Sequence, residues 1–118
     1  MLLSRDLILG ANDLQFEEIE VPEWGGRVRV RSMTAADRDV YEQSLLSARG
    51  PDEQINMRNA RARLLAICLV DADGRRIFDE GDIERLGEKS AAAVSRVFDV
   101  AARLNALGKA DIKELAKN

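Results

Sequence analysis

A Gly-Gly pair separates two short runs of alternating residues, and this pattern constrains the fold more than any other feature of the sequence. Residues 18–21 read EIEV before the pair, and residues 27–31 read RVRVR after it. Alternation with a period of two indicates a strand with one apolar and one charged face. Glycine tolerates the positive φ angles of a two-residue hairpin turn. The sequence therefore predicts a β-hairpin over about residues 16–33.

The register of this hairpin follows if its loop consists of Gly25 and Gly26 alone. Val21 then lies opposite Val30 on the apolar face. Glu20 lies opposite Arg31 on the charged face, and such cross-strand pairs stabilise a sheet. Pro22 has no N–H group for the ladder, so we expect its strand to be an edge or to carry a bulge.

Helical patterns fill most of the remaining chain. Ser4 can cap a short helical turn that ends at Gly10. Thr34 begins a helix that we expect to run to about residue 48. The apolar residues expected to face inward from this second helix are Val40, Tyr41, Leu45 and Ala48.

Further helices are predicted over about residues 52–69, 80–87 and 88–107, with a small terminal helix after Gly108. The helix at 52–69 has Met57, Ala60, Leu64, Ile67 and Cys68 at helical spacing. The helix at 88–107 has Val94, Val97, Phe98, Ala101 and Leu104 at that spacing. Between them, Asp73 and Gly74 predict a tight turn flanked by very short extended segments.

The predicted fold class is therefore α+β: a short N-terminal helix and a β-hairpin, followed by a domain of three to four packed helices. With 118 residues the chain is long enough for one core. We expect a single domain over residues 1–118, with the hairpin at about 16–33 and the helical part at about 34–118.

Composition argues against an enzyme and against a cofactor or metal site. The chain has no histidine, which is the commonest general base and metal ligand, and its one cysteine lies in an apolar helical run. An EF-hand loop starting at Asp71 would place arginines at the positions of a ligand and of the obligatory glycine. No run approaches the ~20 apolar residues that cross a bilayer, so we expect a cytoplasmic protein with no membrane partner.

Nucleic-acid binding is the weaker interpretation of two arginine groups. They are Arg27, Arg29 and Arg31 on the hairpin and Arg58, Arg61 and Arg63 on a helix. No aromatic residues alternate with them for base stacking, and the net charge is −3. We therefore expect no nucleic-acid partner.

Trp24, the single tryptophan, stands beside the hairpin turn. It either folds back over the edge of the core or contacts a partner protein, because tryptophan is enriched at interaction hot spots. The terminal helix is too sparsely apolar to be assigned to the core, so it is a second candidate surface. The candidate interaction residues are Pro22, Trp24, Arg27, Arg29, Arg31, Ile112 and Leu115.

The stretch VPEWGGRVRVRSMTAADRD, residues 21–39, resembles the signature of a family of small proteins of tailed bacteriophages and prophages, the tail assembly chaperones. A later block over residues 62–107 is similar to the same family in its C-x-x-D-x-x-G-x-R-x-F pattern, which starts at Cys68, and in its A-x-x-L-N pattern, which ends at Asn105. The similarity covers nearly the whole chain.

The resemblance implies a non-enzymatic role. Proteins of this family bind the tape measure protein before the tail tube forms, help to recruit tail tube protein, often self-associate, and are absent from the mature virion. It therefore implies action in the host cytoplasm. Some members also have a frameshifted longer form, which this sequence neither shows nor excludes. Two alternatives remain open: a minor virion structural or connector protein, and a small nucleic-acid-binding regulator.

Overall fold

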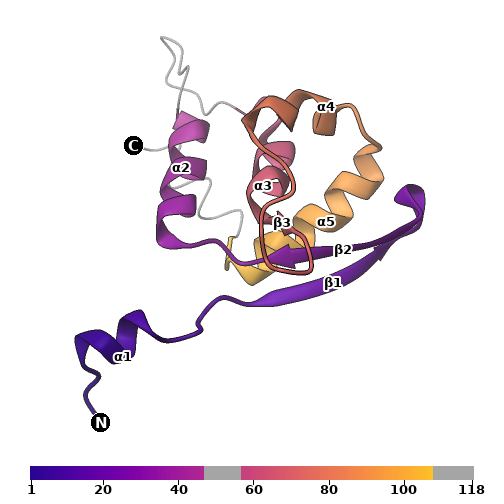
Figure 1. Ribbon diagram of the computed structural model, residues 1–118. Helices are drawn as coiled ribbons and strands as arrows, with labels where there is room; N and C mark the ends of the chain where they lie inside the picture. Colours follow the sequence, from indigo (N-terminus) through magenta and orange to yellow (C-terminus); the bar gives the residue numbers. More distant parts are fainter. Residues whose placement is uncertain (47–56, 108–118) are drawn as a thin grey trace.

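The computed structural model describes residues 1–46 and 57–107 of the chain. A three-stranded antiparallel sheet has the order β1 (Phe16–Val21), β2 (Gly26–Arg31) and β3 (Leu69–Val70). The helices α2 (Ala35–Leu46), α3 (Ala60–Cys68) and α5 (Ala91–Leu104) lie on one side of this sheet, with α3 between the other two (Figure 1). The structure confirms the predicted α+β class.

Shorter helices complete the described part of the chain. They are α1 (Arg5–Leu9), α4 (Ile83–Gly87) and two 3₁₀ turns, η1 (Pro22–Trp24) and η2 (Glu80–Asp82). The Ser4 hydroxyl accepts a hydrogen bond from the Leu7 amide, and the Gly10 amide closes α1 on Asp6. These contacts confirm the short capped helix at the N-terminus. The predicted helix at 80–87 is also confirmed, with a 3₁₀ first turn.

The predicted hairpin is present, but its predicted register was wrong. Val21 lies opposite Gly26 and Glu20 opposite Arg27, so the loop holds residues 22–25 and Gly26 belongs to β2. The loop is longer because Pro22 starts a 3₁₀ turn that closes when the Gly25 amide donates to the Pro22 carbonyl at 3.1 Å. Only Gly25 of the glycine pair has a positive φ, at 77°.

The hydrophobic core is centred on α3. Seven of its nine residues are buried, and the two that are not are Arg61 and Arg63, so most of the circumference of this helix is covered. Val21 and Val30 contribute from the sheet below it, and Val97 and Ala101 contribute from α5. The alternation read in the hairpin thus correctly places Val21 and Val30 on the side of the sheet that faces the core.

Three expectations about helices need correction or fall outside the structure. Val40 was predicted to face inward but is 57% exposed, whereas Tyr41 and Leu45 are buried as expected. Met57 precedes α3 and is exposed, because the first described helical turn begins after Asn59, which has a φ of 53°. Ala48 and the predicted segments 52–56 and 108–118 lie outside the described residues.

The turn after β3 confirms the turn interpretation of the sequence DADG. The Asp71 carboxylate accepts hydrogen bonds from the Asp73 and Arg75 amides at 2.9 and 3.0 Å. These bonds, chiefly the one from Arg75, lower the pKa of Asp71. Val70 pairs with Arg76 across the turn, which gives the short extended flanks that the sequence predicts.

A buried asparagine joins the end of α5 to the segment between β2 and α2. Asn105 accepts a hydrogen bond from the Met33 amide at 2.6 Å and donates one to the Ala101 carbonyl at 2.8 Å. Buried polar side chains need such partners. Asn105 therefore fixes the direction in which the chain leaves the sheet and enters α2.

Within the described residues, no helix combines the length and the apolar character needed to span a bilayer.

Candidate protein-interaction site

The tip of the hairpin is held against α5 by one ion pair. The Arg96 guanidinium donates two hydrogen bonds to the Glu23 carboxylate, at 2.6 and 2.8 Å. This bidentate geometry is the strong form of the arginine–carboxylate interaction. Mainly for this reason, the pKa of Glu23 is lowered from 4.5 to about 2. The residue next to Trp24 is thus anchored to a helix far away in the sequence.

A second ion pair holds the other end of β1 to the same helix. Arg103 donates to the Glu17 carboxylate at 2.6 Å. The hydrogen bond that Arg103 donates to Glu17 raises the pKa of Arg103. The two pairs together fix the edge strand along α5.

Trp24 projects from this anchored tip toward α4. It is half-buried and packs against the core, in agreement with the interpretation that it covers the core edge. It also forms one wall of a cleft of about 590 Å³ between the hairpin tip and α4. The residues that line this cleft are Trp24, Phe78, Asp82, Arg85, Leu86, Glu88 and Lys89.

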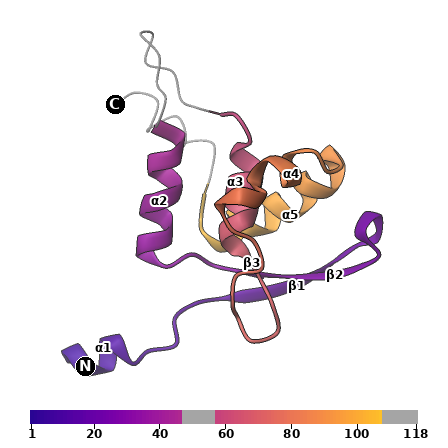
Figure 2. The ribbon, with the colours of Figure 1, turned by 45° about the horizontal axis from the view of Figure 1, so that its top comes forward.

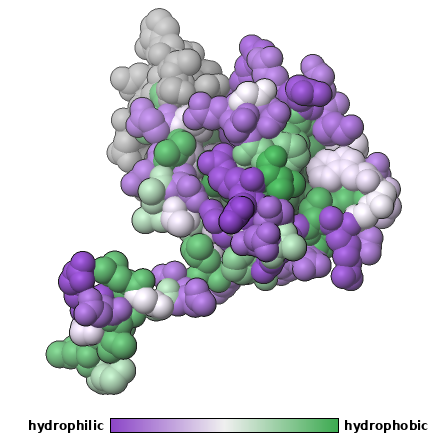
Figure 3. All heavy atoms as spheres, viewed as in Figure 1, coloured by the Kyte–Doolittle hydropathy of each residue, from purple (hydrophilic) through white to green (hydrophobic). Residues whose placement is uncertain are grey.

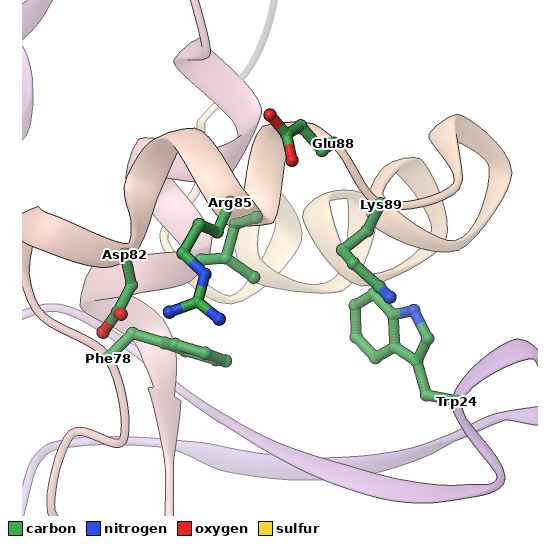
Figure 4. Close-up of a pocket in the computed structure, with 7 residues that line it drawn as sticks. Trp24, Phe78, Asp82, Arg85, Glu88 and Lys89 are labelled. Carbon is green, nitrogen blue, oxygen red and sulfur yellow. The ribbon is translucent and has the colours of Figure 1, made fainter.

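The cleft has an apolar floor and a charged rim. Figure 4 shows the Lys89 side chain lying over the Trp24 indole and Arg85 pointing toward the Phe78 ring on the opposite side. Leu86 is buried beneath them. Asp82 of η2 and Glu88, which follows α4, also line the cleft, so the rim carries both signs of charge. Such a cleft suits an apolar protein segment with charged flanks.

The indole N–H of Trp24 is buried and has no hydrogen-bond partner among the described residues. Buried donors of this kind are rare in folded proteins.

The three hairpin arginines are engaged with their own chain and do not line the cleft. Arg27 pairs with Glu20 at 3.2 Å, and Arg29 donates to the Ala72 carbonyl at 2.7 Å while stacking over the Phe16 ring. Arg31 donates to Asp37 at 2.9 Å, and both side chains are largely buried. Pro22 shapes the turn below Trp24. A role of these residues in partner binding stays a prediction.

Ile112 and Leu115, the other predicted contact residues, lie outside the described residues.

The sequence did not indicate the residues that line the cleft opposite Trp24. Phe78 follows the turn after β3, and Arg85 and Lys89 lie on and just after α4. No spacing in the sequence relates these residues to the hairpin tip, because packing of the tip toward α4 brings them together. The one sequence feature that drew attention to any of these residues was the C-x-x-D-x-x-G-x-R-x-F pattern, which ends at Phe78.

Comparisons with known proteins give a consistent result. A family model described as phage tail assembly chaperone matches residues 4–118. Among solved structures, the tail assembly chaperone of bacteriophage HK97 is similar, with a TM-score of 0.60 and 20% sequence identity over 84% of this chain and 90% of that chain. At this identity the likeness shows a shared fold. No curated protein matches the chain.

Proposed function

Because this chain belongs to the phage tail assembly chaperone family, we propose that it binds the tape measure protein before the tail tube forms and assists assembly of the tube without catalysis. The observation that carries this proposal is the cleft between the hairpin tip and α4. Its apolar floor and its charged rim match the two faces of an amphipathic helix.

The chemistry of a tape measure protein fits such a cleft. A long, mostly helical client exposes apolar stripes that would otherwise associate with one another. One stripe residue would enter between Trp24 and Phe78, and flanking charges would meet the rim side chains Arg85 and Glu88. Modest affinity at each cleft is sufficient, because many copies bind one long client.

The proposal includes two further interactions. The chaperone associates with itself, and it brings tail tube protein to the covered client. It acts in the host cytoplasm and is absent from the mature virion.

Fluorescence of Trp24 tests client binding directly. The chain has one tryptophan, so its emission reports on the cleft alone. Titration with tryptophan-free segments of the tape measure protein should shift that emission and give a saturating curve. Arg85→Glu should weaken binding, because it reverses a rim charge at an exposed position.

The matched control is Arg75→Glu, which makes the same charge change at an exposed position outside the cleft. It should bind like the unmodified chain. If both variants weakened client binding equally, the net charge of the chain, and not the cleft, would determine that binding. No response to any tape measure segment would count against the proposed client.

A further inference from the structure

The first nine residues form an apolar arm that contacts little of its own chain. We call residues 1–9, which end with α1, the N-terminal arm. Six large apolar side chains of the arm are each between 55% and 104% exposed: Met1, Leu2, Leu3, Leu7, Ile8 and Leu9. Figures 1 and 2 show α1 standing away from the body in both views, and Figure 3 shows the apolar lobe that the arm forms there.

The sequence specifies this arm as a helix although packing within the chain does not stabilise it. Ser4 caps its start and Gly10 its end, yet none of its residues is buried. An isolated helix of five residues is unstable in water, since helix stability in proteins comes mostly from packing. A helix that is capped, apolar and uncovered is typical of a segment that packs on another molecule.

The same chain has an apolar groove beside α2. Val40 and Tyr41 of α2 form one wall of this groove, Ile67 of α3 and Ile83 of α4 line it, and Glu80 of η2 lies at its rim. Its volume of about 220 Å³ offers room for a few aliphatic side chains. The exposure of Val40, which contradicts the helical pattern of α2, is explained if this groove is covered by a partner.

The arm leaves the body close to the groove. Gln15 is fixed to Ser32 by two hydrogen bonds of 2.8 Å, one from the Gln15 amide to the Ser32 hydroxyl and one from the Ser32 amide to the Gln15 carbonyl. Ser32 lies shortly before α2, whose side chains form the groove wall. The base of the arm therefore lies near the start of α2, while the arm itself points outward.

We propose that the N-terminal arm of one copy docks into the α2 groove of a second copy. The inference rests on the self-association that is part of the proposed function. Because the arm and the groove are different surfaces, the same contact can repeat from copy to copy and build a chain or a closed ring.

Area and charge support a second copy as the occupant. The arm exposes six large apolar side chains, and with a few of them in the groove and the others over its edges they can supply apolar area of the order of the roughly 800 Å² that each partner buries in a stable interface. Arg5 and Asp6 are exposed charges of opposite sign on the arm, and the groove is lined by charges of both signs, among them Glu80 and Arg76, so pairs of opposite charge can form across the contact.

Cross-linking between two variants tests this contact. Leu7→Cys places a thiol on the arm, and Val40→Cys, in a chain with a size tag, places one in the groove. Mixed with a bismaleimide, they should form a cross-linked heterodimer. The native Cys68 is buried, and burial raises its pKa to about 12, so it should not react. The matched control pairs Leu7→Cys with tagged Asp99→Cys, an exposed position on α5 outside the groove, and should give little heterodimer.

The mass of the protein in solution provides a second, independent test. A Leu7→Asp/Ile8→Asp variant should shift from the mass of the unmodified oligomer to a smaller species that keeps the circular dichroism spectrum of the folded chain, because neither residue is buried within its own chain. An oligomer that persists in this variant would overturn the arm contact while leaving self-association intact. A wild-type chain that is monomeric at all concentrations would overturn both. If the arm variant keeps its oligomer but loses tape measure segments in the Trp24 titration, the arm binds client and the proposal is wrong.

Discussion

The Arg96 guanidinium on α5 donates two hydrogen bonds, of 2.6 and 2.8 Å, to the Glu23 carboxylate at the hairpin tip. Glu23 and Trp24 are neighbours in the same 3₁₀ turn. The ion pair therefore sets the position from which Trp24 reaches α4 and closes the cleft. A contact between residues 73 positions apart thus links the stability of the hairpin to the geometry of the candidate site.

The Glu23–Arg96 pair should make stability depend on pH in the acid range. The pKa of Glu23 is lowered from 4.5 to about 2 in the folded chain. A carboxyl whose folded pKa is lowered stabilises the fold fully above its unfolded pKa, and this contribution is lost as the pH falls through the folded value. Glu23→Gln should therefore melt below the unmodified chain at pH 6, and the difference should vanish near pH 2. A difference that is independent of pH would contradict the pairing.

Trp24→Ala should lower both stability and client binding. Trp24 is half-buried against the core, so we expect a loss of about 2 kcal/mol in the free energy of unfolding, below the 3–5 kcal/mol of a fully buried tryptophan. Trp24→Phe keeps one aromatic ring and removes the five-membered ring of the indole with its N–H, so it should cost less than Trp24→Ala. Urea denaturation followed by circular dichroism measures both variants. A loss for Trp24→Ala as large as for a core residue, with normal client binding once folded, would assign the side chain to the core alone.

Asn105→Ala should destabilise the fold by about 1–3 kcal/mol, because it leaves the Met33 amide without its acceptor in a buried place. Asn12→Ala removes the same side chain at an exposed position and should change little. Thermal unfolding of the two variants gives the comparison. Equal melting temperatures would mean that water or another group replaces the lost hydrogen bond.

Cys68 should resist alkylation until the chain unfolds. Burial raises the pKa of its thiol to about 12, so almost no thiolate forms at neutral pH. Iodoacetamide labelling followed by mass spectrometry should give unlabelled protein in buffer and complete labelling in urea. Fast labelling of the native chain would show that α3 opens readily.

The local signals in the sequence predicted most elements of the fold. Alternation identified the hairpin and the side of it that faces the core, and caps such as Ser4 and Thr34 marked helix starts where the structure has them. These features depend on residues within a few positions of one another, and a local pattern records them directly.

Features that depend on packing could not be predicted in this way. The glycine pair suggested a two-residue turn, but Pro22 and Gly25 together close a longer one. The helical spacing of apolar residues in α2 predicted that Val40 faces the core. That spacing identifies an apolar face but does not show whether another element covers it, and Val40 is exposed. The residues opposite Trp24 come from segments more than fifty positions away, and only the packed structure brings them to the cleft.

The solubility of the tape measure protein in cells tests the central claim most directly. The tape measure protein is expressed alone, with the unmodified chain, and with the Arg85→Glu variant, and its soluble fraction is measured. We expect the tape measure protein to aggregate alone, to remain soluble and co-purify with the unmodified chain, and to be less soluble with the variant. If the unmodified chain neither raises the soluble fraction nor co-purifies, it is not a chaperone of the tape measure protein.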